Sequence, residues 1–206
     1  MLMERKAGHL TKSVQEIAGS LFWIKVVGLG NEGVGKTCLV KNFCEKKFSK
    51  SYHPTVGVDY GFKLHKINST DYRINFWDFG GHTNYDEIRV ELYGQTQACI
   101  LVFDVTNKLS FDSLDYWLQE FTSNGGKQAI VAVVANKTDL SSKRVVSSKD
   151  GQRWAKSRDL RYYETSAATG QGVQDMFSGV LTAVAEGKLV KAKPVVSAEQ
   201  SSSKHK

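Results

Sequence analysis

The segment that most constrains the fold is Gly30-Asn31-Glu32-Gly33-Val34-Gly35-Lys36-Thr37, which matches the pattern G-x-x-x-x-G-K-[ST]. It follows a β-rich apolar run at residues 22–27 and precedes a helical pattern at residues 36–45. Glycines let the backbone wrap around an anion, and the helix N-terminus adds positive partial charge. In such a loop the lysine reaches the β- and γ-phosphates and the hydroxyl binds Mg²⁺. We therefore expect a strand–loop–helix unit that cradles a nucleoside triphosphate, with roles for Lys36 and Thr37.

Strand and helix patterns alternate along the rest of the chain. Strands are predicted at residues 57–67, 72–77, 98–104, 130–135 and 161–164, and further helices at 111–121, 148–158 and 173–186. Asn68-Ser69-Thr70-Asp71 signals a hairpin. This alternation predicts an α/β fold with a six-stranded, mostly parallel sheet and helices on both faces. In such sheets ligands bind at the carboxyl ends of the strands, where every motif below falls.

The base-reading residues follow the buried strand at 130–135. Asn136-Lys137-Thr138-Asp139 resembles the guanine-specificity motif of Ras-type GTPases. The Asp139 carboxylate can accept hydrogen bonds from guanine N1–H and the 2-amino group, two donors that adenine lacks. The resemblance implies a P-loop NTPase of the Ras-like G-domain type that binds GTP or GDP. It also implies that Asn136 bridges base and loop, and that the Lys137 stem covers one ring face.

Thr165-Ser166-Ala167 resembles the last motif of the same family. The resemblance implies that the Ala167 N–H meets guanine O6. Ala168 stands where the family often has a lysine, so one contact with the ring face is reduced to a backbone contact. Phe48 matches an aromatic position that stacks edge-on against guanine; packing in the core is the alternative. The complete set of expected nucleotide-binding residues is Gly30, Asn31, Glu32, Gly33, Val34, Gly35, Lys36, Thr37, Cys38, Phe48, Thr55, Asp78, Gly81, Asn136, Lys137, Asp139, Ser166, Ala167 and Ala168.

Two further segments resemble the nucleotide-sensing switches of Ras-type GTPases. Tyr52-His53-Pro54-Thr55 is similar to the first switch, and Trp77-Asp78-Phe79-Gly80-Gly81 contains the D-x-x-G of the second. The resemblance implies Mg²⁺ ligation by Thr37, by Thr55 and, through water, by Asp78. It also places the Gly81 N–H at the γ-phosphate. His53 is interpreted as an exposed loop histidine, because Mg²⁺ prefers oxygen.

Within the superfamily the chain is most similar to Rab proteins. Val56-Gly57-Val58-Asp59-Tyr60-Gly61 and Phe103-Asp104-Val105-Thr106-Asn107-Lys108-Leu109-Ser110-Phe111 are Rab-like. Cys44-Glu45-Lys46-Lys47-Phe48 resembles the Rab-like branch that is often fused to a J domain. We expect no J domain here, because the one His-Pro pair lies in the first switch and is not followed by Asp.

Two departures from the family pattern concern hydrolysis. His82 stands where the family has a glutamine that orients water, and Glu32 where it has a small residue beside the γ-phosphate. The Glu32 carboxylate would block an arginine finger, bind it unproductively or turn outward. We expect Lys36 and a weakly active His82 in the catalytic role, hence a slow GTPase switch. The alternative is a GTP-loaded binding module that hardly hydrolyses.

The bulk sequence favours one domain, at residues 22–186, between an extension (1–21) and a basic, serine-rich tail (187–206). The extension is either a short helix or a few chance apolar residues. Of the net charge of +7, the tail contributes +4, from five lysines and one glutamate. A nucleic-acid-binding domain would carry the excess charge on its folded surface, so this distribution argues against nucleic-acid binding by the folded domain. The tail is interpreted as solubilising, with weak attraction to anionic surfaces as the alternative.

Location and partners are expectations of the same kind. No apolar run is long enough for a transmembrane helix. Myristoylation needs a glycine at position 2, where this chain has leucine, and prenylation needs a C-terminal cysteine, whereas Cys99 is the last one. Three cysteines at no metal-like spacing favour a reducing compartment, and Cys99 is expected in the core. We therefore expect a cytoplasmic or also nuclear monomer without a stable membrane anchor. Its expected partners are effector proteins, an exchange factor and an activating protein.

Overall fold

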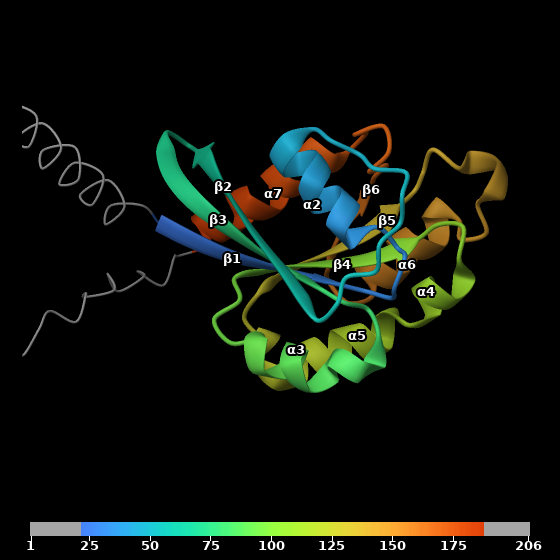
Figure 1. Cartoon of the computed structure of the whole chain (residues 1–206), viewed down its shortest axis with the longest axis horizontal. Helices are drawn as coiled ribbons and strands as arrows, with labels where there is room; N and C mark the ends of the chain where they lie inside the picture. The colour runs from blue at the N-terminus through green and yellow to red at the C-terminus, as the bar shows by residue number, and fades with distance from the viewer. Residues whose placement is uncertain (1–21, 188–206) are drawn as a thin grey trace, which may run out of the picture.

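A computed structural model describes residues 22–187 as a layered α/β domain (Figure 1). Its sheet has six strands in the order β2-β3-β1-β4-β5-β6. The strands are β1 (Phe22–Leu29), β2 (Val58–Ile67), β3 (Thr70–Phe79), β4 (Ala98–Asp104), β5 (Ile130–Asn136) and β6 (Arg161–Glu164). All neighbouring strands are parallel except β2 and β3. The predicted fold class is confirmed.

Helices cover both faces of the sheet (Figure 1). The α-helices are α2 (Lys36–Glu45), α3 (Asp86–Leu92), α4 (Lys108–Asp112), α5 (Leu114–Phe121), α6 (Ser148–Lys156) and α7 (Val173–Glu186). Helices α2 and α7 pack on one face, and α3, α5 and α6 on the other. The two hydrophobic clusters meet across β4, whose residues are all buried, as expected for a continuous apolar strand.

The hairpin between β2 and β3 is tighter than its sequence signal suggested. Asn68 and Ser69 both have positive φ, at 47° and 70°, and Ile67 pairs directly with Thr70. A two-residue turn with two positive φ values matches the twist of the flanking strands. The second strand therefore begins at Thr70, two residues before the predicted start.

One helix was not predicted, and its composition explains why. Helix α3 buries Arg89, and three of its seven residues are Asp86, Glu87 and Glu91. No apolar stripe marks such a helix, so hydrophobic periodicity misses it. The predicted helix 111–121 is also divided, because α4 ends at Asp112 and α5 begins at Leu114.

Within residues 22–187, no helix combines the length and apolarity needed to cross a membrane. Cys99 is buried, as predicted. The expectations for the extension at 1–21 and for the tail beyond Gly187 lie outside the described residues.

Candidate functional site

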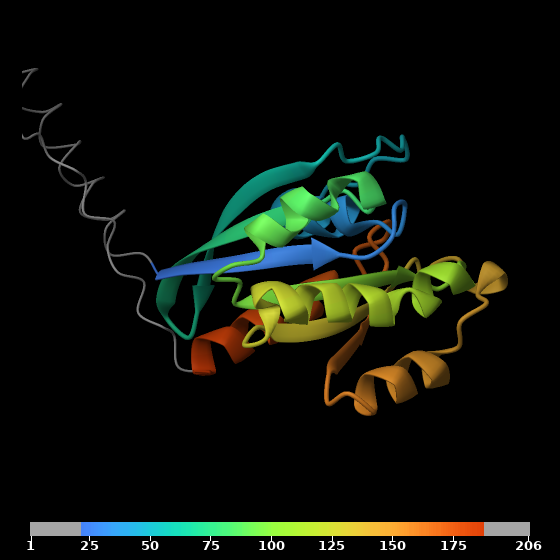
Figure 2. The ribbon, with the colours of Figure 1, turned by 90° about the horizontal axis from the view of Figure 1, so that it is seen from below.

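A cavity of about 520 Å³ lies where the loops that follow the strands gather. Figure 2 shows β1 ending at this side of the molecule. The predicted residues that line the cavity are Glu32, Gly33, Gly35, Lys36, Thr37, Cys38, Phe48, Thr55, Gly81, Asn136, Lys137, Asp139, Ala167 and Ala168. They come from five loops that are far apart in the sequence. Parallel strands bring these loops together because their carboxyl ends share one edge.

The phosphate loop is held by a close backbone approach at Gly35. Its φ is +98°, and a Cβ there would lie 2.4 Å from Nδ2 of Asn136, so a side chain is excluded. The Asn136 amide donates from Nδ2 to the Val34 carbonyl at 2.8 Å. Asn136 therefore ties the phosphate loop to the end of β5, and the contact of its side chain with the base stays a prediction.

The Lys36 side chain is buried and folded back onto its own loop. Its Nζ donates to the carbonyls of Gly30, at 2.7 Å, and Asn31, at 3.0 Å. Burial lowers the pKa of Lys36 to about 8, partly offset by the negative charge of Asp78. A phosphate anion would favour the charged form strongly, so ligand binding at this loop should take up a proton.

This linkage predicts a pH dependence of nucleotide affinity. Affinity should fall above pH 8, by up to about tenfold per pH unit, because the free protein loses the Lys36 proton that the complex retains. Isothermal titration with GDP and Mg²⁺ across this range measures it. The Lys36→Met variant should show a flat profile, and an unchanged wild-type affinity above pH 8 would contradict the argument.

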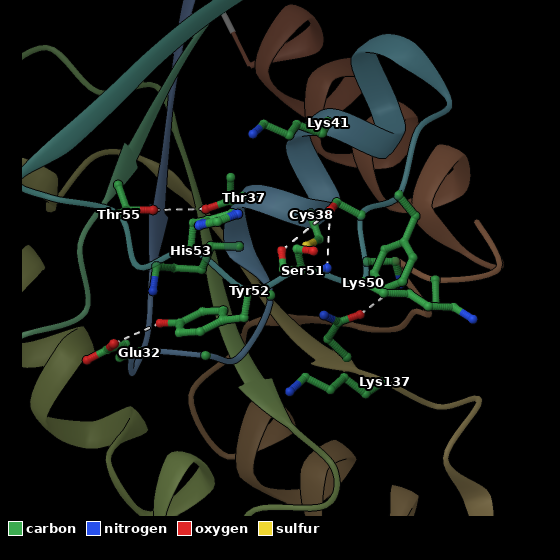
Figure 3. A pocket seen from close by; sticks show the side chains of 18 of the residues that line it. Glu32, Thr37, Cys38, Lys41, Lys50, Ser51, Tyr52, His53, Thr55 and Lys137 are labelled. Atoms are coloured by element: carbon green, nitrogen blue, oxygen red, sulfur yellow. Dashed lines mark hydrogen bonds between the residues drawn. The ribbon is translucent and has the colours of Figure 1, made fainter.

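The three predicted Mg²⁺ ligands lie together: Thr37 and Thr55 line the cavity, and Asp78 is buried behind them. The hydroxyl oxygens of Thr37 and Thr55 lie 3.1 Å apart (Figure 3). The Thr37 hydroxyl also donates a hydrogen bond to Asp78. The other carboxylate oxygen of Asp78, Oδ1, is buried without a hydrogen-bond partner among the described residues. An unpartnered anionic oxygen beside two hydroxyls fits a hard cation such as Mg²⁺.

Clusters of three or more His, Cys, Asp or Glu side chains that could hold a metal are absent from residues 22–187. Two of the three predicted ligands are threonines, so such a cluster is not expected for this site. His53 is exposed at the cavity wall, in agreement with its interpretation as a loop residue.

The base-reading residues form a connected group at the opposite end. Asp139 accepts a hydrogen bond from the buried Ser166 hydroxyl at 2.6 Å. Ser166 therefore does not line the cavity but orients the carboxylate that does. Lys137 pairs with Asp104 at 2.7 Å, which holds its stem along the wall.

The predicted donor to guanine O6 is engaged inside the protein. The Ala167 N–H donates to Oδ1 of Asn136 at 3.1 Å. Contact with O6 would therefore require a shared or exchanged hydrogen bond. Phe48 is 43% exposed and lines the cavity, so the core-packing alternative is wrong.

The structure adds lining residues that the sequence analysis missed, chiefly the segment before β2. These are Lys41, Lys47, Ser49, Lys50, Ser51, Tyr52, Phe79 and Leu140. A loop without regular periodicity carries little signal of which side chains turn inward, although its lysines beside Phe48 could have suggested an anion.

Glu32 turns toward the first switch segment, residues 52–55. Its carboxylate accepts a hydrogen bond from the Tyr52 hydroxyl at 2.8 Å (Figure 3). Burial, with this bond, raises the pKa of Tyr52 to about 12. The carboxylate therefore contacts the opposite loop across the cavity, and the expected alternative in which it turns outward to solvent is not observed.

His82 lies outside the cavity lining. It is exposed, and its Nδ1 accepts a hydrogen bond from the Asn84 N–H at 3.2 Å. This bond leaves the neutral ring with the proton on Nε2, hence with a donor but no free acceptor. Asn31 also points away, since its amide contacts Trp117 and Ser113.

The arrangement of phosphate loop, base-reading loops and switches agrees with a family assignment. The model of the Ras family matches residues 25–186. The chain belongs to the Ras family. A Ras-family domain is a GTP-binding switch of the small GTPase class, and members bind GTP or GDP with Mg²⁺.

Curated relatives are similar over the same region. The chain is 41% identical over 168 residues to "DnaJ homolog subfamily C member 27" of Danio rerio, covering 79% of this chain and 62% of the relative. The protein of that name from Rattus norvegicus is 45% identical over 159 residues, covering 75% and 58%. The human one is 43% identical over 159 residues, with the same coverage. The chain thus spans about three fifths of these relatives. Their similarity agrees with the Rab-like, J-domain-related resemblance.

Proposed function

We propose that this Ras-family chain is a slow GTPase that cycles between GTP and GDP and signals through effector proteins. The observation that carries the proposal is the state of His82, whose Nδ1 is occupied by the Asn84 N–H. In-line attack on the γ-phosphate needs a water held by an acceptor while its proton leaves. A neutral ring that can only donate orients that water poorly, so the step is slow rather than blocked.

The remaining chemistry is assigned to the loops. Lys36 and the N–H groups of residues 33–37 would stabilise the charge that spreads over the transferred phosphoryl group. Thr37, Thr55 and Asp78 would hold Mg²⁺, which neutralises charge on the β- and γ-phosphates. Loss of the γ-phosphate would release Thr55 and Gly81, and with them both switches.

The Glu32–Tyr52 pair bears on activation by partners. An arginine finger enters beside the γ-phosphate and is worth about 10³–10⁵ in rate. Here it would meet the carboxylate and phenol that span the cavity mouth. We therefore propose that Glu32→Gly changes hydrolysis mainly when an activating protein is present.

Single-turnover hydrolysis of GTP by the purified chain tests the role of His82. The His82→Gln variant should hydrolyse at least about tenfold faster than wild type, because the amide offers both a donor and an acceptor near the water. His65→Gln, on β2 and away from the loops, is the matched control and should not change the rate. Equal rates for wild type and His82→Gln would refute the argument.

The alternative is a GTP-loaded binding module with no useful hydrolysis. It shares every nucleotide contact and differs only in turnover. A wild-type rate no higher than that of a Lys36→Met variant, together with GTP on protein isolated from cells, would favour it. A cytoplasmic or nuclear location is also a proposal, supported by three free cysteines.

A further inference from the structure

Arg89, on helix α3, has a fully buried side chain although it carries a charge. Its guanidinium donates to two backbone carbonyls of the second switch segment (residues 78–82), Gly80 at 3.2 Å and His82 at 2.9 Å. Nε and Nη2 donate to the two carboxylate oxygens of Glu120, each at 3.1 Å. A fixed fork of donors of this kind holds both partners in one geometry. Arg89 therefore joins the second switch to helix α5.

Helix α5 holds the phosphate loop as well. The Trp117 indole Nε1 donates to the Asn31 side-chain oxygen at 2.7 Å, and the same ring stacks under the Arg89 guanidinium at 4.7 Å. Trp117 and Glu120 are three residues apart, so they lie on one face of α5. One helical face thus contacts both segments that surround the γ-phosphate position.

The charges in this cluster are mutually satisfied. Burial alone would raise the pKa of Glu120, but hydrogen bonds from Arg89, Tyr93 and Tyr116 lower it overall. The Tyr93 hydroxyl donates at 2.5 Å and that of Tyr116 at 2.8 Å. Because each buried polar group has a partner, losing one leaves the others unpaired and the cluster responds as a unit.

The backbones of the two held segments touch at Gly81. A Cβ on Gly81 would lie 2.4 Å from the Glu32 nitrogen and 2.5 Å from the Asn31 carbonyl carbon. No space is available for the second switch to shift toward the phosphate loop. The second switch and the phosphate loop are therefore in direct backbone contact at Gly81, and α5 holds both of them.

We propose that Arg89, Trp117 and Glu120 are positioning residues that hold the Gly81 N–H against the γ-phosphate, and so set the preference for GTP over GDP. The inference rests on the proposed nucleotide switch and deepens it. None of the three side chains lines the cavity, so they act through the backbone of Gly80–His82 and through Asn31.

The predicted signature is a change in the ratio of two affinities. GDP has no γ-phosphate, so disordering the second switch should leave its dissociation constant unchanged. A non-hydrolysable GTP analogue should bind about tenfold more weakly to Arg89→Gln. Arg89→Lys, which keeps the charge but not the fork, should recover part of the loss.

Trp117→Phe is the conservative test, because it removes the indole N–H while keeping an aromatic ring. The ratio of the affinity for the GTP analogue to the affinity for GDP should fall about threefold to fivefold in this variant. The double variant Asn31→Ala/Trp117→Phe should be no worse than Asn31→Ala alone, which already removes the hydrogen bond from Trp117 together with the one to Ser113. Trp154→Phe is the matched control; its indole donates to Asp115 at 3.3 Å, away from both loops, and its ratio should equal that of wild type.

Competition titrations with GDP and the GTP analogue, in the presence of Mg²⁺, decide the matter. Equal weakening of both nucleotides in Trp117→Phe, or an unchanged ratio in Trp117→Phe and Arg89→Gln, would overturn the positioning role. If Arg89→Gln does not fold, the affinities of Trp117→Phe for GDP and for the GTP analogue are sufficient to support or overturn the positioning role. Failure of wild type to bind either nucleotide would instead overturn the proposed function. Because the GTP analogue is not hydrolysed, the two affinities can be measured whatever the hydrolysis rate of the protein.

Discussion

An Asp139→Asn variant is expected to bind GTP at least about 10³-fold more weakly than wild type and to gain affinity for xanthosine triphosphate. The Asp139 carboxylate lines the cavity, and its Oδ1 is held by the Ser166 hydroxyl at 2.6 Å. An amide in its place presents a donor where guanine also presents donors. Xanthine has a carbonyl at the purine 2-position, which can accept from that amide. The two guanine donors left without an acceptor beneath the bound base account for the size of the loss.

Competition of GTP, xanthosine triphosphate and ATP for a fluorescent nucleotide measures this preference. Asp159→Asn is a suitable control, because Asp159 is exposed and its φ of 55° suits asparagine. Equal displacement by ATP and GTP on wild type would refute guanine specificity itself. An unchanged preference in Asp139→Asn would remove Asp139 from its assigned role.

A Lys36→Met variant is expected to lose GTP affinity by about 10²- to 10³-fold, or roughly 3–4 kcal/mol. The Lys36 ammonium is buried at the base of the phosphate loop, where a charged group interacts strongly with phosphate. Methionine preserves the apolar stem and the volume, so the fold should be retained. The loss should be larger for GTP than for the nucleoside guanosine, which has no phosphate.

Lys156→Met, on the exposed surface of α6, controls for the loss of one positive charge. Its GTP affinity should match that of wild type. Thermal unfolding without nucleotide separates binding from folding, because Lys36→Met should unfold at or above the wild-type temperature. A buried ammonium with a lowered pKa is unfavourable for the free protein. Equal GTP affinity of Lys36→Met and wild type would contradict the phosphate role.

The sequence by itself determined the order of the strands, the position of most helices and the chemistry of the principal loops. A strand with an apolar run like that in Ala98–Asp104 is stable only when both of its faces are buried. The pattern of Gly30–Thr37 is typical of a loop that wraps around an anion. Local propensity and spacing suffice for such features, because each depends on residues adjacent in the chain. The hairpin that joins β2 and β3 was likewise predicted from its turn residues.

Tertiary structure decided which side chains of those loops face the nucleotide position. The Asn31 amide turns to Trp117, and Ser166 supports Asp139 from behind rather than lining the cavity. Helix α3 forms without an apolar stripe, because Arg89 is paired inside the fold with Glu120 from a helix 31 residues away. Contacts between residues so distant in sequence leave no periodic trace in either segment. Their energies depend on burial and geometry, and both exist only once the sheet has brought the loops together.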